Sequence, residues 1–231
     1  MRLELVNVIK EFCEMFKFEY LDGEFELVTT DDIAEYVKRD DEEYYEREKD
    51  GITEAYGLFY ENSRGRKTLV ISKKQDSLNL AVTTIHEYVH LCDYKQYGEL
   101  HPEKSLRELQ EDYVFKYWTE FHAPYMAYKY YIATSHNFNL EFSANTIVRS
   151  VQSKLVYQKR LEIHYAMYQS VHAYGEYIAL CESYPDRMNA HPINFYINNK
   201  FREIYRFLFT HTTIDKFLED YQRFEKLINS I

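Results

Sequence analysis

The glycines of this chain are unevenly placed, which restricts where tight turns and strands can form. Five of the six glycines lie at or before Gly98, and only Gly175 comes later. Runs rich in β-forming residues and turn residues show the same bias towards the first part of the chain. We therefore expect an α+β fold, in which a mixed N-terminal part precedes a C-terminal half that is nearly all helix.

The N-terminal part carries four local patterns. Apolar residues at helical spacing predict a helix over residues 1–18. FELVTT at residues 25–30 predicts a short strand, and Thr30 or Asp31 can cap the acidic helix that follows. Two β-rich runs, residues 56–60 and 67–72, flank turn residues and predict a hairpin.

The rest of the chain predicts a series of helices. Ser77 can cap a helix that ends near Gly98, and a second helix begins around Ser105 and is broken or kinked at Pro124. A long helix from about residue 139 to Ser183 follows, then a loop over residues 185–192 and two more helices.

Composition and charge exclude several functional classes. The formal net charge of -10, with no stripe of lysine and arginine, argues against direct binding to nucleic acid. No apolar stretch approaches the roughly 18 residues of a membrane span, and the N-terminus does not read as a secretory signal. The cysteines are odd in number and far apart, at positions 13, 92 and 181, which favours a reducing, cytoplasmic location.

The pattern that carries chemistry is His86-Glu87-Tyr88-Val89-His90. Positions i and i+4 of a helix share one face, with β-carbons about 5–6 Å apart, so the two imidazoles can bind one metal ion. Glu87 is rotated by about 100° from His86 and so flanks the ion, where it can accept a proton from water. Apolar residues before and within this segment continue a helical stripe, which places the histidines at the border of a buried face.

At this point the sequence resembles the zincin metallopeptidases, over about residues 55–127. The resemblance implies that His86 and His90 bind Zn²⁺ and that Glu87 activates zinc-bound water against a peptide carbonyl. It also implies a zincin-like fold, with a small antiparallel sheet packed on the motif helix. An extended substrate would add to the edge of that sheet, which the hairpin at residues 56–72 would provide. The third histidine of metzincins is absent, because Leu91, Cys92 and Asp93 follow the motif.

The third ligand must come from another segment, and Glu120 is the expected residue. It lies thirty residues after His90, on a helix that can return antiparallel to the motif helix. The arrangement resembles the glutamate zincins and is similar to the ImmA/IrrE-type peptidases, whose Glu-x-x-Ala pattern is matched by Glu120 and Ala123. This similarity implies an intracellular protein substrate, such as a repressor. The rival acids are Glu111, Glu108 and Asp112.

Several other residues near the motif have two readings. Asp93 could accept the second ring proton of His90, or face solvent. Cys92 is more typical of a small buried residue than of a ligand, and His122 lies about 200° around the helix from Glu120. An i, i+4 ladder on the long helix could supply a donor to an oxyanion, although a polar helix face is the more typical reading. Its members are His164, Tyr168, His172 and Glu176.

The sequence thus predicts a zinc metallopeptidase that acts on a peptide or protein substrate. The expected organisation is a zincin-like catalytic region over residues 1–135 and a helical region over residues 136–231, packed on it or forming one domain with it. One alternative is a non-catalytic, metal-stabilised interaction protein. Another is a helical binding protein that holds a partner through its tyrosine-rich half, in which the motif is accidental.

Overall fold

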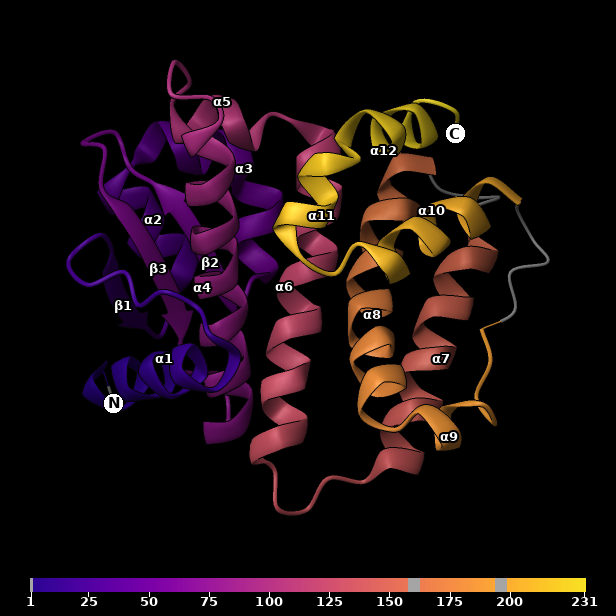
Figure 1. The fold of residues 1–231 in the computed structure, drawn as a ribbon. Helices are drawn as coiled ribbons and strands as arrows, with labels where there is room; N and C mark the ends of the chain where they lie inside the picture. The colour runs from indigo at the N-terminus through magenta and orange to yellow at the C-terminus, as the bar shows by residue number, and fades with distance from the viewer. Residues whose placement is uncertain (1, 158–162, 194–198) are drawn as a thin grey trace. The chain divides into compact units, whose positions relative to one another are not determined.

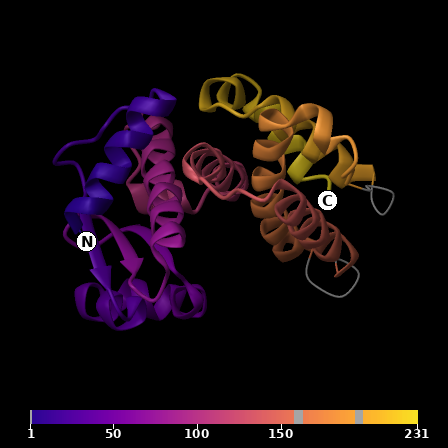
Figure 2. The same ribbon diagram turned by 90° about the horizontal axis from the view of Figure 1, so that it is seen from below.

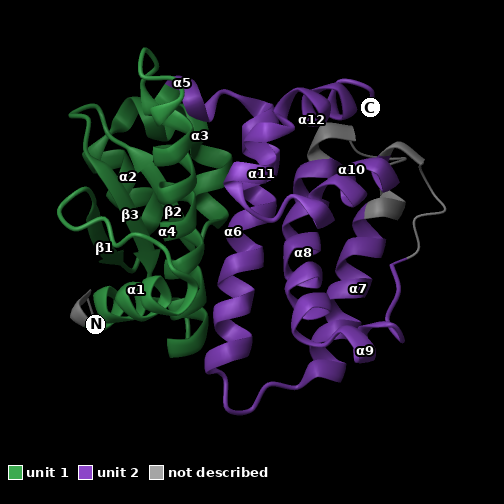
Figure 3. Ribbon diagram, in the orientation of Figure 1, with its two compact units in different colours: residues 1–107 green, residues 108–231 purple. Residues whose placement is uncertain are grey.

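The strands and the mixed pattern of elements lie in the first part of the chain, as the glycine distribution predicts. The computed structural model describes residues 2–157, 163–193 and 199–231. Tertiary contacts divide the chain into two compact units, residues 1–107 and 108–231, shown in Figure 3. The sequence suggested a boundary after residue 135. The division comes earlier because helix α6 (Tyr113–Thr134) packs along α8 (Ile163–Ser183) and so belongs with the C-terminal helices.

A three-stranded sheet forms the centre of the first unit. Its strands are β1 (Glu26–Thr30), β2 (Gly57–Glu61) and β3 (Lys67–Ser72), in the order β1-β3-β2. β2 and β3 form the expected antiparallel hairpin, but β1 pairs with β3 in parallel. The expectation of an antiparallel sheet is therefore wrong, and the sheet is mixed. Helices α2 (Ile33–Asp40) and α3 (Glu42–Glu54) follow β1, β2 then runs back along the sheet, and β3 continues in the direction of β1.

Both faces of this sheet are covered by helices (Figure 1). On one face, Tyr60 and Val70 pack with apolar residues of α2 and α3 in a buried cluster. The opposite face meets α4 (Ser77–Glu99), where the rings of Phe59 and Tyr94 lie 6.1 Å apart. α1 (Arg2–Phe16) packs on α4 and also contacts β1, while α4 contacts β2 and β3, so the two helices lie side by side against the sheet.

Aspartates begin three helices of the first unit. The side chains of Asp32, Asp41 and Asp76 accept hydrogen bonds from backbone N–H groups in the first turns of α2, α3 and α4. The caps predicted for α2, Thr30 and Asp31, lie two residues and one residue before the observed cap. The cap predicted for α4, Ser77, lies one residue after the observed cap. Neighbouring residues here are all able to cap, so the sequence pattern alone does not select one.

Three long helices dominate the second unit (Figures 1 and 2). α8 packs along both α6 and α7 (Leu140–Tyr157). Two hydrogen bonds show that α6 and α8 run parallel. Tyr168 of α8 donates to Glu120 of α6 near the starts of the helices, and Lys129 of α6 donates to Glu182 of α8 near their ends. They approach closely at Gly175, where a β-carbon would lie 2.3 Å from the carbonyl oxygen of Phe121. Only glycine allows this spacing.

Several predicted helix limits in the second half were wrong. The helix expected from Ser105 is divided into α5 (Leu106–Gln110) and α6, while α6 runs through Pro124. The long helix expected up to Ser183 is two helices, α7 and α8. The loop expected at 185–192 begins with α9 (Pro185–Met188), and the described C-terminal residues form three further helices rather than two. These are α10 (Asn199–Thr210), α11 (Ile214–Glu219) and α12 (Tyr221–Ile228).

The C-terminal helices close an aromatic core in the second unit. Trp118 of α6 stacks on Phe217 of α11, with ring centroids 4.6 Å apart, and its indole N–H donates to the carbonyl of His211 at 2.9 Å. Phe207 stacks on Phe224 of α12 in the same way. Within the described ranges, no helix is both long enough and apolar enough to cross a membrane.

Candidate metal centre

Helix α4 carries the motif, and most of the residues in its central part are buried. Asp76 fixes its first turn by accepting from the N–H groups of Leu78 and Asn79. Tyr88 anchors its middle, because the buried phenol accepts from the N–H of Leu21 at 2.9 Å and donates to the carbonyl of Glu19 at 2.6 Å. The rotation of α4 is therefore set from the side of Tyr88, which leaves His86 and His90 on another face.

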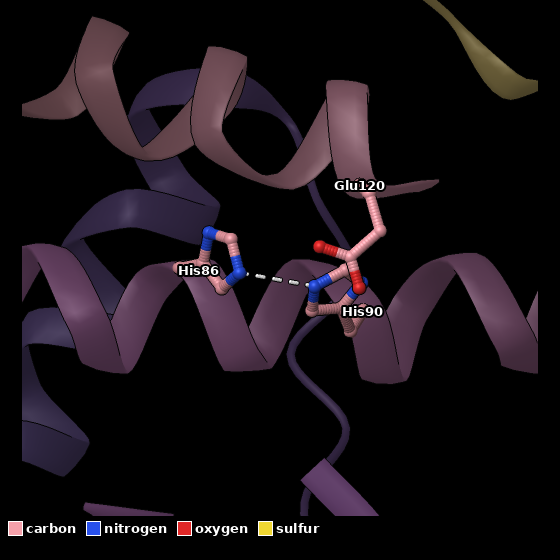
Figure 4. A group of neighbouring side chains, drawn as sticks. All are labelled: His86, His90 and Glu120. Carbon is pink, nitrogen blue, oxygen red and sulfur yellow. Dashed lines mark hydrogen bonds between the residues drawn. The ribbon is translucent and has the colours of Figure 1, made fainter. Parts of the chain in front are cut away.

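The two histidines converge, as their i, i+4 spacing predicts. Their Nε2 atoms form a hydrogen bond at 3.0 Å, and their rings are nearly perpendicular, at 82° (Figure 4). Two nitrogens on a tetrahedral zinc ion, with bonds of 2.0–2.1 Å, would stand about 3.3 Å apart. The pair therefore fits a zinc ion with a movement of a few tenths of an ångström. His86 is partly exposed and His90 is buried.

Glu87 is held against the edge strand β2. The residue is 7% exposed. A β-carbon added to Gly57 would lie 2.7 Å from Oε1 of Glu87 and 2.5 Å from Cγ2 of Thr83. Thr83 in turn donates to Gln75, whose amide donates to the carbonyl of Tyr56. A glycine at the start of β2 thus makes room for the carboxylate of Glu87.

Glu120 belongs to the second unit, where α6 and α8 surround its carboxylate. Its Oε1 accepts a hydrogen bond from the hydroxyl of Tyr168 at 2.8 Å. Burial raises the pKa of the Glu120 carboxyl, whereas His172, the Tyr168 hydrogen bond and Lys116 act to lower it. Burial outweighs these three neighbours, so the net shift of the Glu120 pKa is upward.

The rival acids have other surroundings. Asp112 accepts from the N–H groups of Val114 and Phe115 at the start of α6, and from the hydroxyl of Tyr221. Its carboxylate is therefore used in capping and in holding α12. Glu108 and Glu111 are exposed, in α5 and in the short turn after it. Of the four acids, Glu120 is the one that lies within the long helix α6.

The secondary candidates near the motif are all buried. Asp93 is 2% exposed, so its solvent-facing reading is wrong. Cys92 is buried, and burial raises the pKa of its thiol well above the ordinary value, in agreement with a packing role. His122 is buried and stacks on Trp118 at 4.7 Å, which turns it towards the aromatic core of its own unit.

The ladder on α8 is a polar face that meets α6 and α7. Tyr168 and His172 lie beside Glu120, while Glu176 is near Lys154 of α7. The hydroxyl proton of Tyr168 is directed at Glu120, so the phenol is placed as a partner of that carboxylate rather than as an oxyanion donor. The side chain of His164 lies outside the described residues.

Sequence reasoning missed two glycines that shape these surroundings, Gly57 and Gly175. An isolated glycine inside a helical pattern, as at Gly175, weakens the helix and commonly has a packing reason. Gly57 stands at the first residue of a strand, where it reads equally well as ordinary turn chemistry, so no comparable sign was present.

No family model matches the chain, and no curated protein or solved structure matches it. The likeness to zincins therefore depends on the motif and its neighbouring residues.

Proposed function

We propose that this protein is a zinc-dependent metallopeptidase. The observation that carries the proposal is the convergence of the His86 and His90 Nε2 atoms, 3.0 Å apart on one face of α4. Glu87 lies between them in the sequence and is held against Gly57 of the edge strand. An arrangement of two nitrogen donors with an adjacent carboxylate is typical of zinc hydrolases.

Glu120 is the proposed third ligand, and Figure 4 draws the three side chains of this candidate set. Two histidines and one glutamate form a known type of catalytic zinc site, which leaves a fourth position for water or substrate. Its position within the long helix α6, rather than in α5, the following turn or the cap of α6, supports Glu120 over Glu111, Glu108 and Asp112.

The proposed reaction is hydrolysis of a peptide bond. A bound zinc ion would polarise the scissile carbonyl and lower the pKa of water at the site. Glu87 would take a proton from the attacking water as the new C–O bond forms, and would pass it to the amide nitrogen as the C–N bond breaks. Water is thereby divided between a new carboxylate and a new amine.

An extended peptide is the substrate that the fold favours. β2 lies at the edge of the sheet, and its first residue, Gly57, touches Glu87. A peptide added along this edge would pair its backbone with β2 and pass close to the base. A cytoplasmic protein substrate is in keeping with three free cysteines, Cys13, Cys92 and Cys181.

One observation favours the second candidate, a metal-stabilised interaction protein without catalysis. Glu87 is only 7% exposed, and a base must reach the water that attacks the substrate. In that case the metal would bind and no peptide would be cleaved.

The test is a comparison of the parent with Glu87→Gln and with the double variant His86→Ala, His90→Ala. Glu87→Gln keeps the size of the side chain and removes the proton acceptor. We expect it to retain about one zinc per chain while cleavage of a denatured protein mixture falls about 10²-fold or more. The double variant should lose both zinc and cleavage.

Each other outcome has a distinct meaning. Undiminished cleavage by Glu87→Gln would remove this residue from the mechanism. Stoichiometric zinc in the double variant would place the metal elsewhere. Zinc in the parent with no cleavage of any tested protein would favour the non-catalytic candidate.

A further inference from the structure

We propose that Tyr168 is a positioning residue that orients Glu120 for metal binding, an inference that rests on the proposed function. Its hydroxyl donates to Oε1 of Glu120 at 2.8 Å. An ionised carboxylate has about four lone-pair sites, so it can accept this hydrogen bond and still bind a metal. Partners of this kind, bonded to a metal ligand, commonly change metal affinity by about 10- to 100-fold.

The packing of the second unit fixes where the phenol of Tyr168 lies. The close approach at Gly175 holds α8 against α6, and Tyr168 is seven residues earlier on α8, which is about two helical turns. Lys116 lies over the phenol ring, with Nζ 5.7 Å from the centroid. Since Lys116 and Glu120 are one turn apart on α6, the phenol contacts both, through its ring and its hydroxyl.

The backbone of α6 lacks one hydrogen bond at Glu120. Residue 124 would normally donate its N–H to the carbonyl of residue 120, but Pro124 has no N–H. α6 therefore has one intrahelical hydrogen bond fewer at the residue that carries the proposed ligand. The bond from Tyr168 ties the end of that side chain to α8 instead.

The experiment measures zinc affinity by competition with a chromogenic chelator. Tyr168→Phe removes only the hydroxyl, and we expect the zinc dissociation constant to rise about 10-fold or more. Tyr177→Phe is the matched control, because Tyr177 lies on the same helix and its hydroxyl donates to the carbonyl of His191. The control should change zinc affinity less than about twofold, at a similar thermal stability.

A double-mutant cycle separates positioning from a general structural effect. In a Glu120→Ala background, Tyr168→Phe should cause no further loss of zinc affinity, because the ligand on which it acts is gone. The visible absorption of Co²⁺ bound at the site should also change with Tyr168→Phe and stay unchanged with Tyr177→Phe.

The outcomes distinguish this inference from the function on which it depends. A parent protein that binds zinc through His86, His90 and Glu120, with unchanged affinity in Tyr168→Phe, would overturn the role of Tyr168 alone. An equal loss of affinity in the presence and absence of Glu120 would also overturn it. A parent that binds no zinc would overturn the proposed function together with the inference.

Discussion

Gly57 and Glu87 are in direct contact across the junction of β2 and α4, at a distance that leaves no room for a side chain on Gly57. A β-carbon there would stand 2.7 Å from Oε1 and 2.8 Å from Cγ of Glu87. Both atoms belong to the residue proposed as the base, so a change at the edge strand β2 would act directly on that side chain.

Gly57→Ala should therefore lower peptide cleavage more than zinc binding. The added methyl group forces Glu87 to move, and a displacement of about 1 Å at a catalytic group can reduce the rate about 10²-fold. Cleavage and zinc content, measured on the same preparation, check the prediction. Gly51→Ala is the control, because no atom lies within 4 Å of a β-carbon there and alanine favours its helix. Equal activity of the two variants would contradict a role for the Gly57 contact.

Glu120→Ala should release zinc, whereas Glu111→Ala should not. Removing one of the three proposed ligands would leave only the histidine pair. We therefore expect the zinc dissociation constant to rise by more than about 100-fold, the largest change that loss of an outer-shell partner commonly causes. Isothermal titration of the metal-free variants with zinc provides the measurement. Glu111 is exposed in the turn before α6, so its loss should change neither affinity nor stability. The reverse ranking would mean that the third ligand was wrongly assigned.

Glu176 should make the stability of the protein depend on pH. Burial raises the pKa of its carboxyl from 4.5 to about 7, with Lys154 acting in the opposite direction. The folded state thus binds more protons than the unfolded state between these values. The contribution of Glu176 to the free energy of unfolding is full below about pH 4.5 and is lost as the pH rises through about 7.

The variant Glu176→Gln removes this dependence. The unfolding free energy of the variant minus that of the parent should increase by about 1–3 kcal/mol between pH 5 and pH 8. This range allows for partial solvent screening. Urea unfolding at the two pH values provides the measurement, with exposed Glu203→Gln as the control. A difference from the parent that does not change with pH would show that Glu176 titrates normally.

The convergence of the histidines followed from the sequence, but the surroundings of the carboxylates did not. His86 and His90 are one helical turn apart, so their juxtaposition needs only a helix over residues 83–94. The contacts Gly57–Glu87 and Tyr168–Glu120 join residues 30 and 48 positions apart. Such contacts depend on how elements pack, which local periodicity does not determine.

Strand pairing shows the same limit. The hairpin of β2 and β3 was predicted because a short turn joins its strands. β1 is joined to its partner β3 through α2, α3 and β2, and nothing in FELVTT distinguishes a parallel from an antiparallel neighbour. The parallel register, with Leu27 opposite Leu69, buries both leucines and became evident only from the fold.

The central place of β3 also governs the order in which this protein can assemble as it leaves the ribosome. β1 and β2 each pair with β3, and β3 is the last of the three strands in the chain. While residues 1–66 are being made, the two earlier strands have no partner in the sheet. Sheet closure waits for Lys67–Ser72, and α4 follows directly. The segment that carries His86 and His90 therefore follows, in the chain, all three strands on which its helix packs.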